Sequence, residues 1–157
     1  NPAVTIGFAV AGRFEWKNIP GYVLAQIIGA LAASGVLHLL FPAHEKLGAT
    51  LPSGSAMQSF VLELILTAIL MLAILRISTG AKEKGITAGI AIGGIIALEA
   101  MFAGPICGAS MNPARSLAPA IVSGHVEHLW IYLTATVLGA FVAVPLAKAV
   151  EAPADPS

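Results

Sequence analysis

Apolar residues along this chain fall into long runs that are separated by short segments rich in Gly, Pro and charged side chains. A helix that crosses a lipid bilayer needs about 20 mostly apolar residues. Four runs reach this length, at residues 19–41, 60–77, 85–103 and 129–147. The pattern therefore predicts an all-α membrane protein with four full spans.

Two shorter apolar runs, at residues 2–10 and 113–122, have about half the length that a span requires. Each run opens with Pro directly after Asn, as Asn1-Pro2 and Asn112-Pro113. Asn caps the free backbone N–H groups of a helix start, and Pro fits the first helical turn. We therefore expect two half-helices that begin at these dipeptides.

Composition supports a membrane protein, because 57% of the residues are hydrophobic and only 10% are charged, whereas soluble domains carry about 25% charged residues. Eight basic and eight acidic residues cancel, which leaves no basic face for nucleic acid. The only cysteine, Cys107, has no partner for a disulfide within the chain. Nothing around it has the spacing of metal ligands, so neither a metal nor a cofactor is expected.

Basic residues predict the orientation, because cytoplasmic loops of membrane proteins are enriched in Lys and Arg. If the four spans alternate, Lys46 and Arg115 lie on one side, and the C-terminus lies on the other, cytoplasmic side. The cytoplasmic side then holds Arg13, Lys17, Arg76, Lys82, Lys84 and Lys148. The tail at 151–157 is expected to be disordered, and a start at Asn1 instead of Met suggests a truncated N-terminus.

A short internal repeat carries the candidate function. The first box, Asn1-Pro2-Ala3, and the second box, Asn112-Pro113-Ala114, each head one predicted half-helix. One copy alone would indicate only a capped helix start, but two copies that enter from opposite sides are typical of an inverted repeat. Irregular backbone at membrane depth is tolerated where it lines a watery cavity. We expect the two Asn amides to face a pore, where they can donate to a solute oxygen.

Both boxes and the segment 108–116, Gly-Ala-Ser-Met-Asn-Pro-Ala-Arg-Ser, resemble the major intrinsic proteins, the aquaporin and aquaglyceroporin family. Residues 103–111 are most similar to the nodulin-like intrinsic branch and its bacterial relatives. The resemblance implies one aquaporin-like domain over 1–157, with the family's first two of six spans absent. It also implies a homotetramer in the plasma or inner membrane, which passes water and small neutral solutes.

The same resemblance implies that Ala100, Ala109 and Arg115 occupy three of the four positions of the family's narrow filter. Arg115 would act there as a fixed cation with several donors. Water-selective members have His where this chain has Ala100, so a wider filter is expected. Such a filter favours glycerol-like polyols or metalloid acids, such as arsenous, boric or silicic acid, alongside water.

Alternatives to this solute class stay open at the sequence level. Ser116 and Ala120 resemble the water-selective pattern, whereas Tyr132 and Leu133 resemble glycerol facilitators. A secondary transporter is a further alternative, because inverted repeats and broken helices also occur in carriers. A structural membrane fragment without transport of its own is the third.

Two acidic residues lie inside the predicted spans, where an ionisable group is a functional candidate because its burial is costly. The family resemblance implies that Glu63 braces the re-entrant loop by accepting its backbone N–H groups. For Glu99 the direction in which the side chain points stays undecided. Neither Glu has a nucleophile or second carboxylate beside it in sequence, so an enzyme is not expected.

Glycines and aromatic residues in the spans have structural interpretations. Small residues such as Gly29, Gly93 and Gly139 allow helix backbones to approach closely. Aromatic residues near span ends form a belt at the membrane interface. The chain has four at such places, Trp16, Tyr22, Trp130 and Tyr132.

Overall fold

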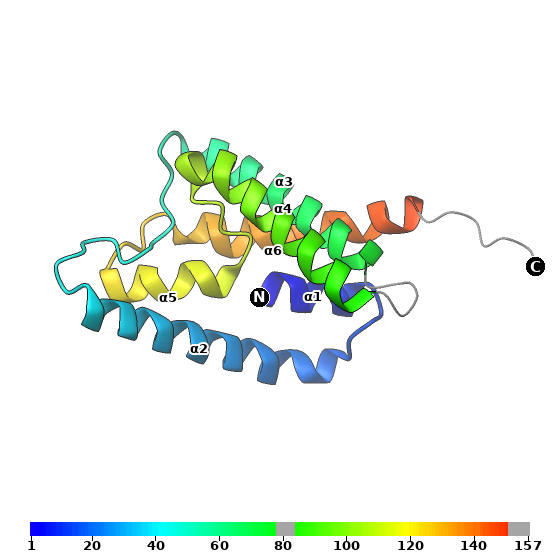
Figure 1. Cartoon of the computed structure of the whole chain (residues 1–157), viewed down its shortest axis with the longest axis horizontal. Helices are drawn as coiled ribbons and strands as arrows, with labels where there is room; N and C mark the ends of the chain where they lie inside the picture. Colours follow the sequence, from blue (N-terminus) through cyan, green and yellow to red (C-terminus); the bar gives the residue numbers. More distant parts are fainter. Residues whose placement is uncertain (78–83, 151–157) are drawn as a thin grey trace, which may run out of the picture.

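The computed structural model describes residues 1–77 and 84–150, and all regular elements in these ranges are helices. Four long helices can each cross a membrane by length and composition: α2 (Ile19–Leu40), α3 (Ala56–Ile77), α4 (Lys84–Cys107) and α6 (Leu129–Ala149). Two short helices are α1 (Pro2–Val10) and α5 (Pro113–Ser123), and a 3-10 turn, η1 (Trp16–Asn18), precedes α2. The predicted spans and half-helices are confirmed (Figure 1).

The helix α4 continues beyond its predicted end at residue 103. It tolerates Pro105, because a proline in the last turn removes only one backbone hydrogen bond, and it ends at Cys107. Gly108 follows with φ of 90°, a left-handed conformation that costs glycine nothing. Lys82 and the tail 151–157, for which the sequence predicts a cytoplasmic position and disorder, lie outside the described residues.

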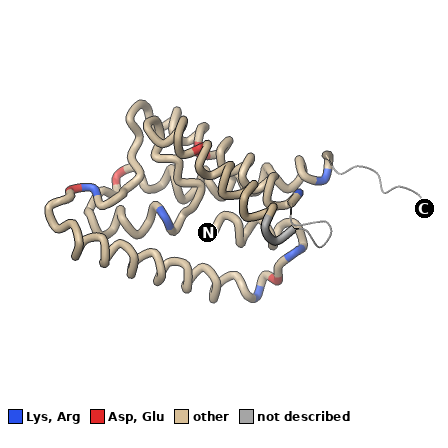
Figure 2. Tube along the Cα trace, in the orientation of Figure 1, with Lys and Arg blue, Asp and Glu red and all other residues tan. Residues whose placement is uncertain are grey.

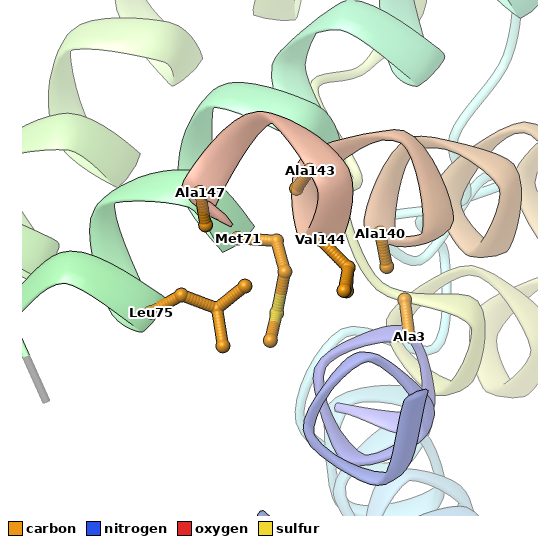
Figure 3. Packing of buried hydrophobic residues seen from close by; sticks show 7 residues of the cluster. All are labelled: Ala3, Met71, Leu75, Ala140, Ala143, Val144 and Ala147. Carbon is orange, nitrogen blue, oxygen red and sulfur yellow. The ribbon is translucent and has the colours of Figure 1, made fainter. Parts of the chain in front are cut away.

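The centre of the molecule is the contact between α3 and α6, against which α1 also packs (Figure 3). Gly7 of α1 makes room for Met71 of α3, since a Cβ at Gly7 would lie 2.8 Å from the Met71 sulfur. Most side chains in this cluster are small, which allows close helix packing. Its buried members are Ala3, Met71, Leu75, Ala140, Ala143, Val144 and Ala147.

The other long helices, α2 and α4, lie on the outside of this centre (Figure 1). Only 6% of the most apolar window of α2 and 17% of that of α4 are buried, against 39% for α3 and 44% for α6. Their large exposed apolar surfaces suit contact with lipid or with further membrane helices. On the inner side, α4 packs on α3, and α2 packs on α5 and α1.

Most charged residues lie near the two ends of the bundle, and a few lie between the ends (Figure 2). Arg13, Arg76 and Lys148 line a single pocket at one end. The Arg13 guanidinium donates from Nη1 to the Leu75 carbonyl oxygen, at 2.8 Å. The structure thus brings together three basic residues that the sequence predicts on one side of the membrane.

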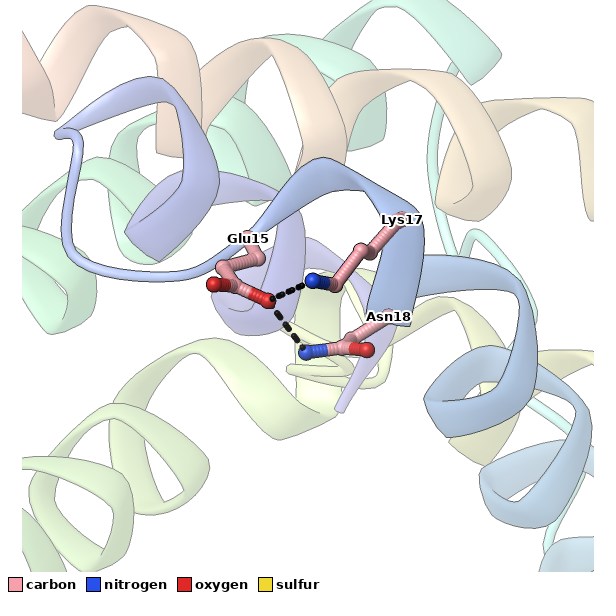
Figure 4. A network of polar contacts seen from close by, with 3 residues as sticks. All are labelled: Glu15, Lys17 and Asn18. Carbon is pink, nitrogen blue, oxygen red and sulfur yellow. Dashed lines mark hydrogen bonds and ion pairs between the residues drawn. The ribbon is translucent and has the colours of Figure 1, made fainter.

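An exposed polar cluster forms the turn between α1 and α2 (Figure 4). Glu15 Oε2 lies 3.0 Å from Lys17 Nζ and accepts a hydrogen bond from Asn18 Nδ2 at 3.3 Å. The Lys17 and Glu15 side chains are 78% and 65% exposed, so this ion pair contributes little stability. The cluster marks a polar surface of the molecule.

Three of the four aromatic residues predicted for the interface belt are exposed, and their place at a membrane interface stays a prediction. Trp16, Tyr22 and Trp130 are exposed, as a membrane interface requires. For Tyr132 the prediction is wrong, because this side chain is fully buried and its hydroxyl donates to the Cys107 carbonyl oxygen at 2.7 Å. Its ring packs inside the protein, where the buried hydroxyl needs a protein partner.

Candidate functional site

The two half-helices meet end to end at their N-termini, where the chain begins (Figure 1). Asn1 Oδ1 caps α1 by accepting from the Ala3 backbone N–H at 3.1 Å. Asn112 Oδ1 caps α5 in the same way, by accepting from Ala114 N–H at 3.1 Å. Because both side-chain oxygens serve the helix ends, the amide nitrogens are left as donors.

A direct hydrogen bond joins the first box to Met111, the residue before the second box, which lies 110 residues away in sequence. Asn1 Nδ2 donates to the Met111 carbonyl oxygen at 2.7 Å. An amide nitrogen carries two hydrogens, so Asn1 retains one more donor. The nine residues of α1 and the eleven of α5, at about 1.5 Å per residue, together measure about 30 Å, the thickness of a bilayer core. The junction therefore divides a bilayer-length path near its middle.

A cleft of about 500 Å³ opens at this junction. It is lined by Asn1 from the first box and by Asn112 and Ala114 from the second, with Arg115 beside them. The opposite wall is α2, which contributes two alanines, Leu37 and the polar residues Gln26 and Ser34. The cleft thus combines a few oriented donors with a largely apolar wall, as small-molecule sites do.

Arg115 is fixed in the first turn of α5 by the loop that connects α2 to α3. Its Nη1 donates to the Gly48 carbonyl oxygen at 2.7 Å. A guanidinium has five N–H donors, so this single bond orients the group and leaves others for a ligand. The arrangement places a permanent positive charge at the cleft, next to the positive ends of two helices.

Glu63 of α3 is fully buried and holds the loop before the second box. Its Oε1 accepts from Ser110 N–H at 2.8 Å, and its Oε2 accepts from Met111 N–H at 2.9 Å. In this loop Ala109 and Met111 have φ of 42° and 52°, which is uncommon for residues other than glycine. Such conformations persist only where surrounding contacts determine them, and the Glu63 carboxylate supplies two.

Glu99, whose direction the sequence leaves undecided, points into the protein. The side chain is 2% exposed, and neither carboxylate oxygen has a hydrogen-bond partner among the residues that the structure describes. It lies between Ile95 and Ala103, both of which belong to the apolar contact between α4 and α3. The structure therefore separates Glu99 from the cleft.

The predicted filter residues are only partly brought together. Arg115 lines the cleft, whereas Ala109 is 7% exposed and packs in the apolar contact between α3 and α4. Ala100 is exposed on α4 and is not among the residues that line this cleft. The filter role of the two alanines stays a prediction.

Sequence reasoning missed a buried set of hydroxyls behind the second box. Thr50 Oγ1 donates to Ser116 Oγ at 2.7 Å, and Ser116 Oγ lies 2.5 Å from Ser110 Oγ. Ser110 and Ser116 flank the second box in sequence, which was the only available signal. Thr50 is distant in sequence, so no pattern connects it to the box. Within the described ranges, no cluster of three or more metal-binding side chains occurs.

Comparisons with known proteins agree on one family. A family model described as major intrinsic protein matches residues 1–146. The chain is 50% identical over 141 residues to aquaporin NIP1-1 of Zea mays, which covers 89% of this chain and 50% of that protein. Nodulin-26 of Glycine max is also 50% identical, over 89% of this chain and 52% of its own length.

Similarity extends to a solved structure. The X-ray structure of the aquaglyceroporin from Plasmodium falciparum superposes with a TM-score of 0.81 at 25% identity. The superposition covers 96% of this chain and 74% of that one. The chain spans about half the length of the curated relatives that it matches.

Proposed function

This chain belongs to the major intrinsic protein family, as its boxes indicate, and we propose that the protein conducts water and small neutral solutes passively across a membrane. The observation that carries the proposal is the meeting of two Asn-capped half-helices at one cleft. No covalent chemistry is needed, so we propose a channel and not an enzyme. Its long apolar helices make the chain an integral, multi-pass membrane protein.

In the proposed mechanism, Asn1 and Asn112 donate to the oxygen of a passing solute and replace the hydrogen bonds that it leaves in water. The helix axes of α1 and α5 point their positive ends at the same place, which disfavours cations. Arg115 adds a full positive charge and further donors. Neutral molecules with oxygens that accept hydrogen bonds therefore meet the lowest free-energy barrier. Pro2 and Pro113 start the two helices, and Ala3 and Ala114 complete the boxes.

For the solute class, we propose glycerol-like polyols or metalloid acids in addition to water. Small residues at Ala100 and Ala109 would leave a wide filter in the assembled channel. The solved structure that the chain resembles is that of an aquaglyceroporin, which is consistent with this class. A water-selective channel is the second candidate, because Ser116 and Ala120 follow the water-selective pattern after the second box.

We further propose a homotetramer in the plasma or inner membrane, with a cytoplasmic C-terminus and a single aquaporin-like domain over 1–157. The pocket that gathers Arg13, Arg76 and Lys148 at one end supports this orientation. The exposed apolar surfaces of α2 and α4 leave area for contacts between subunits or with lipid.

Stopped-flow light scattering on proteoliposomes of the whole protein tests the function. Vesicles are challenged in turn with an impermeant osmolyte, glycerol and a neutral metalloid acid. Fast shrinkage followed by rapid reswelling in glycerol or the metalloid acid is expected. Fast shrinkage alone would assign a water-selective channel, and saturating or ion-coupled flux would assign a carrier. Flux no faster than in empty vesicles refutes the channel.

Replacing Ala100 by His is expected to lower glycerol or metalloid flux by about tenfold or more relative to water flux, because a pocket discriminates by this factor when its size changes by a small group. The imidazole would narrow the filter and add a polar wall. The same stopped-flow traces give both fluxes. Equal loss of water and glycerol flux argues against a filter position for Ala100.

A further inference from the structure

We propose that Thr50, in the loop between α2 and α3, is a positioning residue that sets the backbone of Asn112 through a chain of buried hydroxyls. The inference rests on the proposed channel function and adds a residue to its machinery. Thr50 does not line the cleft, so it acts through other groups and not by touching solute.

The direction of the hydroxyl chain follows from counting protons. Thr50 Oγ1 donates to Ser116 Oγ at 2.7 Å, and Ser110 Oγ donates to the Asn112 carbonyl oxygen at 2.9 Å. Each hydroxyl has one hydrogen, so Ser110 has none left for the 2.5 Å contact with Ser116. Ser116 is therefore the donor in that contact. The chain runs from Thr50 through Ser116 and Ser110 to Asn112.

Because the hydroxyls are buried, the direction of their hydrogen bonds depends on Thr50 and not on water. The three residues Thr50, Ser110 and Ser116 are 5%, 6% and 0% exposed, so bulk water is kept from the hydroxyls. Ser116 has a competing acceptor, because a helical serine can also donate to the carbonyl four residues earlier, which is that of Asn112. The bond from Thr50 holds Ser116 in the rotamer that serves Ser110. Without it, Ser116 is free to rotate and Ser110 loses its donor.

The loop that carries Thr50 also contacts both flanks of the second box. Gly108 precedes the box, and a Cβ there would lie 2.9 Å from the Thr50 Cβ, so the Thr50 side chain packs directly on this glycine. Two residues before Thr50, the Gly48 carbonyl oxygen orients Arg115. The loop thereby contacts the segments before and after Asn112, which lines the cleft.

The test compares Thr50→Val with Thr50→Ser in proteoliposomes of the whole protein, with flux normalised to the folded channels in the vesicles. Valine keeps the shape and removes the hydroxyl, so flux per channel is expected to fall about fivefold, the factor that one neutral hydrogen bond represents. The ratio of glycerol to water flux should change as well. Thr50→Ser keeps a hydroxyl at this position, so its flux per channel and its ratio of glycerol to water flux should match those of the wild type.

Thr134→Val is the matched control, because the hydrogen bonds that the Thr134 hydroxyl makes to described residues stay within its own helix, to Trp130 O at 2.7 Å and to Ile131 O at 3.5 Å. Its flux and ratio should equal those of the wild type. Unchanged flux and ratio in Thr50→Val, or a Thr50→Ser channel as impaired as Thr50→Val, overturns the positioning role.

If Thr50→Val does not fold, Ser116→Ala removes the next hydroxyl of the chain and must change the same ratio. A Ser116→Ala channel with wild-type flux and ratio would overturn the proposal. A wild-type protein without flux would refute the channel function itself, which is a different result from a conducting wild type with unaffected variants.

Discussion

Replacing Glu63 by Gln is expected to abolish most of the flux and to lower the free energy of unfolding by about 3 kcal/mol, the cost of leaving buried groups unsatisfied. Both Glu63 oxygens accept backbone N–H groups, from Ser110 and Met111. Glutamine replaces one acceptor by an NH2 group that must face an N–H donor. The loop before the second box would then leave its left-handed conformations. Thermal unfolding in detergent and stopped-flow flux measure the two effects.

Glu99→Gln is the matched control, because it makes the same chemical change at a buried carboxyl group. Neither Glu99 oxygen has a hydrogen-bond partner among the described residues, so no bond is lost. A buried, unpaired carboxylate is costly, and the neutral amide should leave stability equal or higher. Comparable losses in the two variants would contradict the bracing role of Glu63.

Replacing Gly139 by Ala is expected to lower the free energy of unfolding by about 1–3 kcal/mol, the range for an overpacked core. Among substitutions of glycine by alanine in this chain, it should be the most destabilising. A Cβ at Gly139 would collide with the Leu64 carbonyl oxygen and come within 2.9 Å of the Thr67 Cβ. Both belong to α3, and backbone atoms cannot move aside as a flexible side chain can. The central helices α3 and α6 must therefore separate. The midpoint of thermal unfolding in detergent reports this change.

Gly35→Ala supplies the comparison within α2, because among the described residues no atom beyond the neighbouring backbone of α2 lies within 4 Å of a Cβ at that position. Alanine there gains up to about 1 kcal/mol of helix propensity over glycine, so stability should hold or rise. A Gly139→Ala protein as stable as Gly35→Ala would show that α3 and α6 are not packed as closely as described.

Local chemistry in the sequence determined which segments cross the membrane and where the half-helices start. Run length alone sufficed for the spans, because a bilayer sets a minimum number of apolar residues. Asn1 and Asn112 could be assigned as caps because a capping side chain acts on backbone groups two or three residues away. The repeated box then identified the family.

Only the tertiary structure decided which face of each helix is buried. In a soluble helix the polar face reveals the direction of the core, but membrane helices are apolar on all sides and carry no such signal. Gly29, Gly93 and Gly139 therefore look alike in sequence. Within the described part of the chain, Gly139 alone among these three has atoms of another helix within 4 Å of its Cβ position.

The same reason applies to the polar residues. The apolar pattern alone does not distinguish Glu63, which bonds two backbone N–H groups, from Glu99, which lies inward without a partner among the described residues. Only the family resemblance indicated the bracing role of Glu63. The bond of Arg115 to the Gly48 carbonyl and that of Thr50 to Ser116 join segments more than sixty residues apart, at 67 and 66. Such contacts depend on how the helices pack, and that packing exists only in the folded chain.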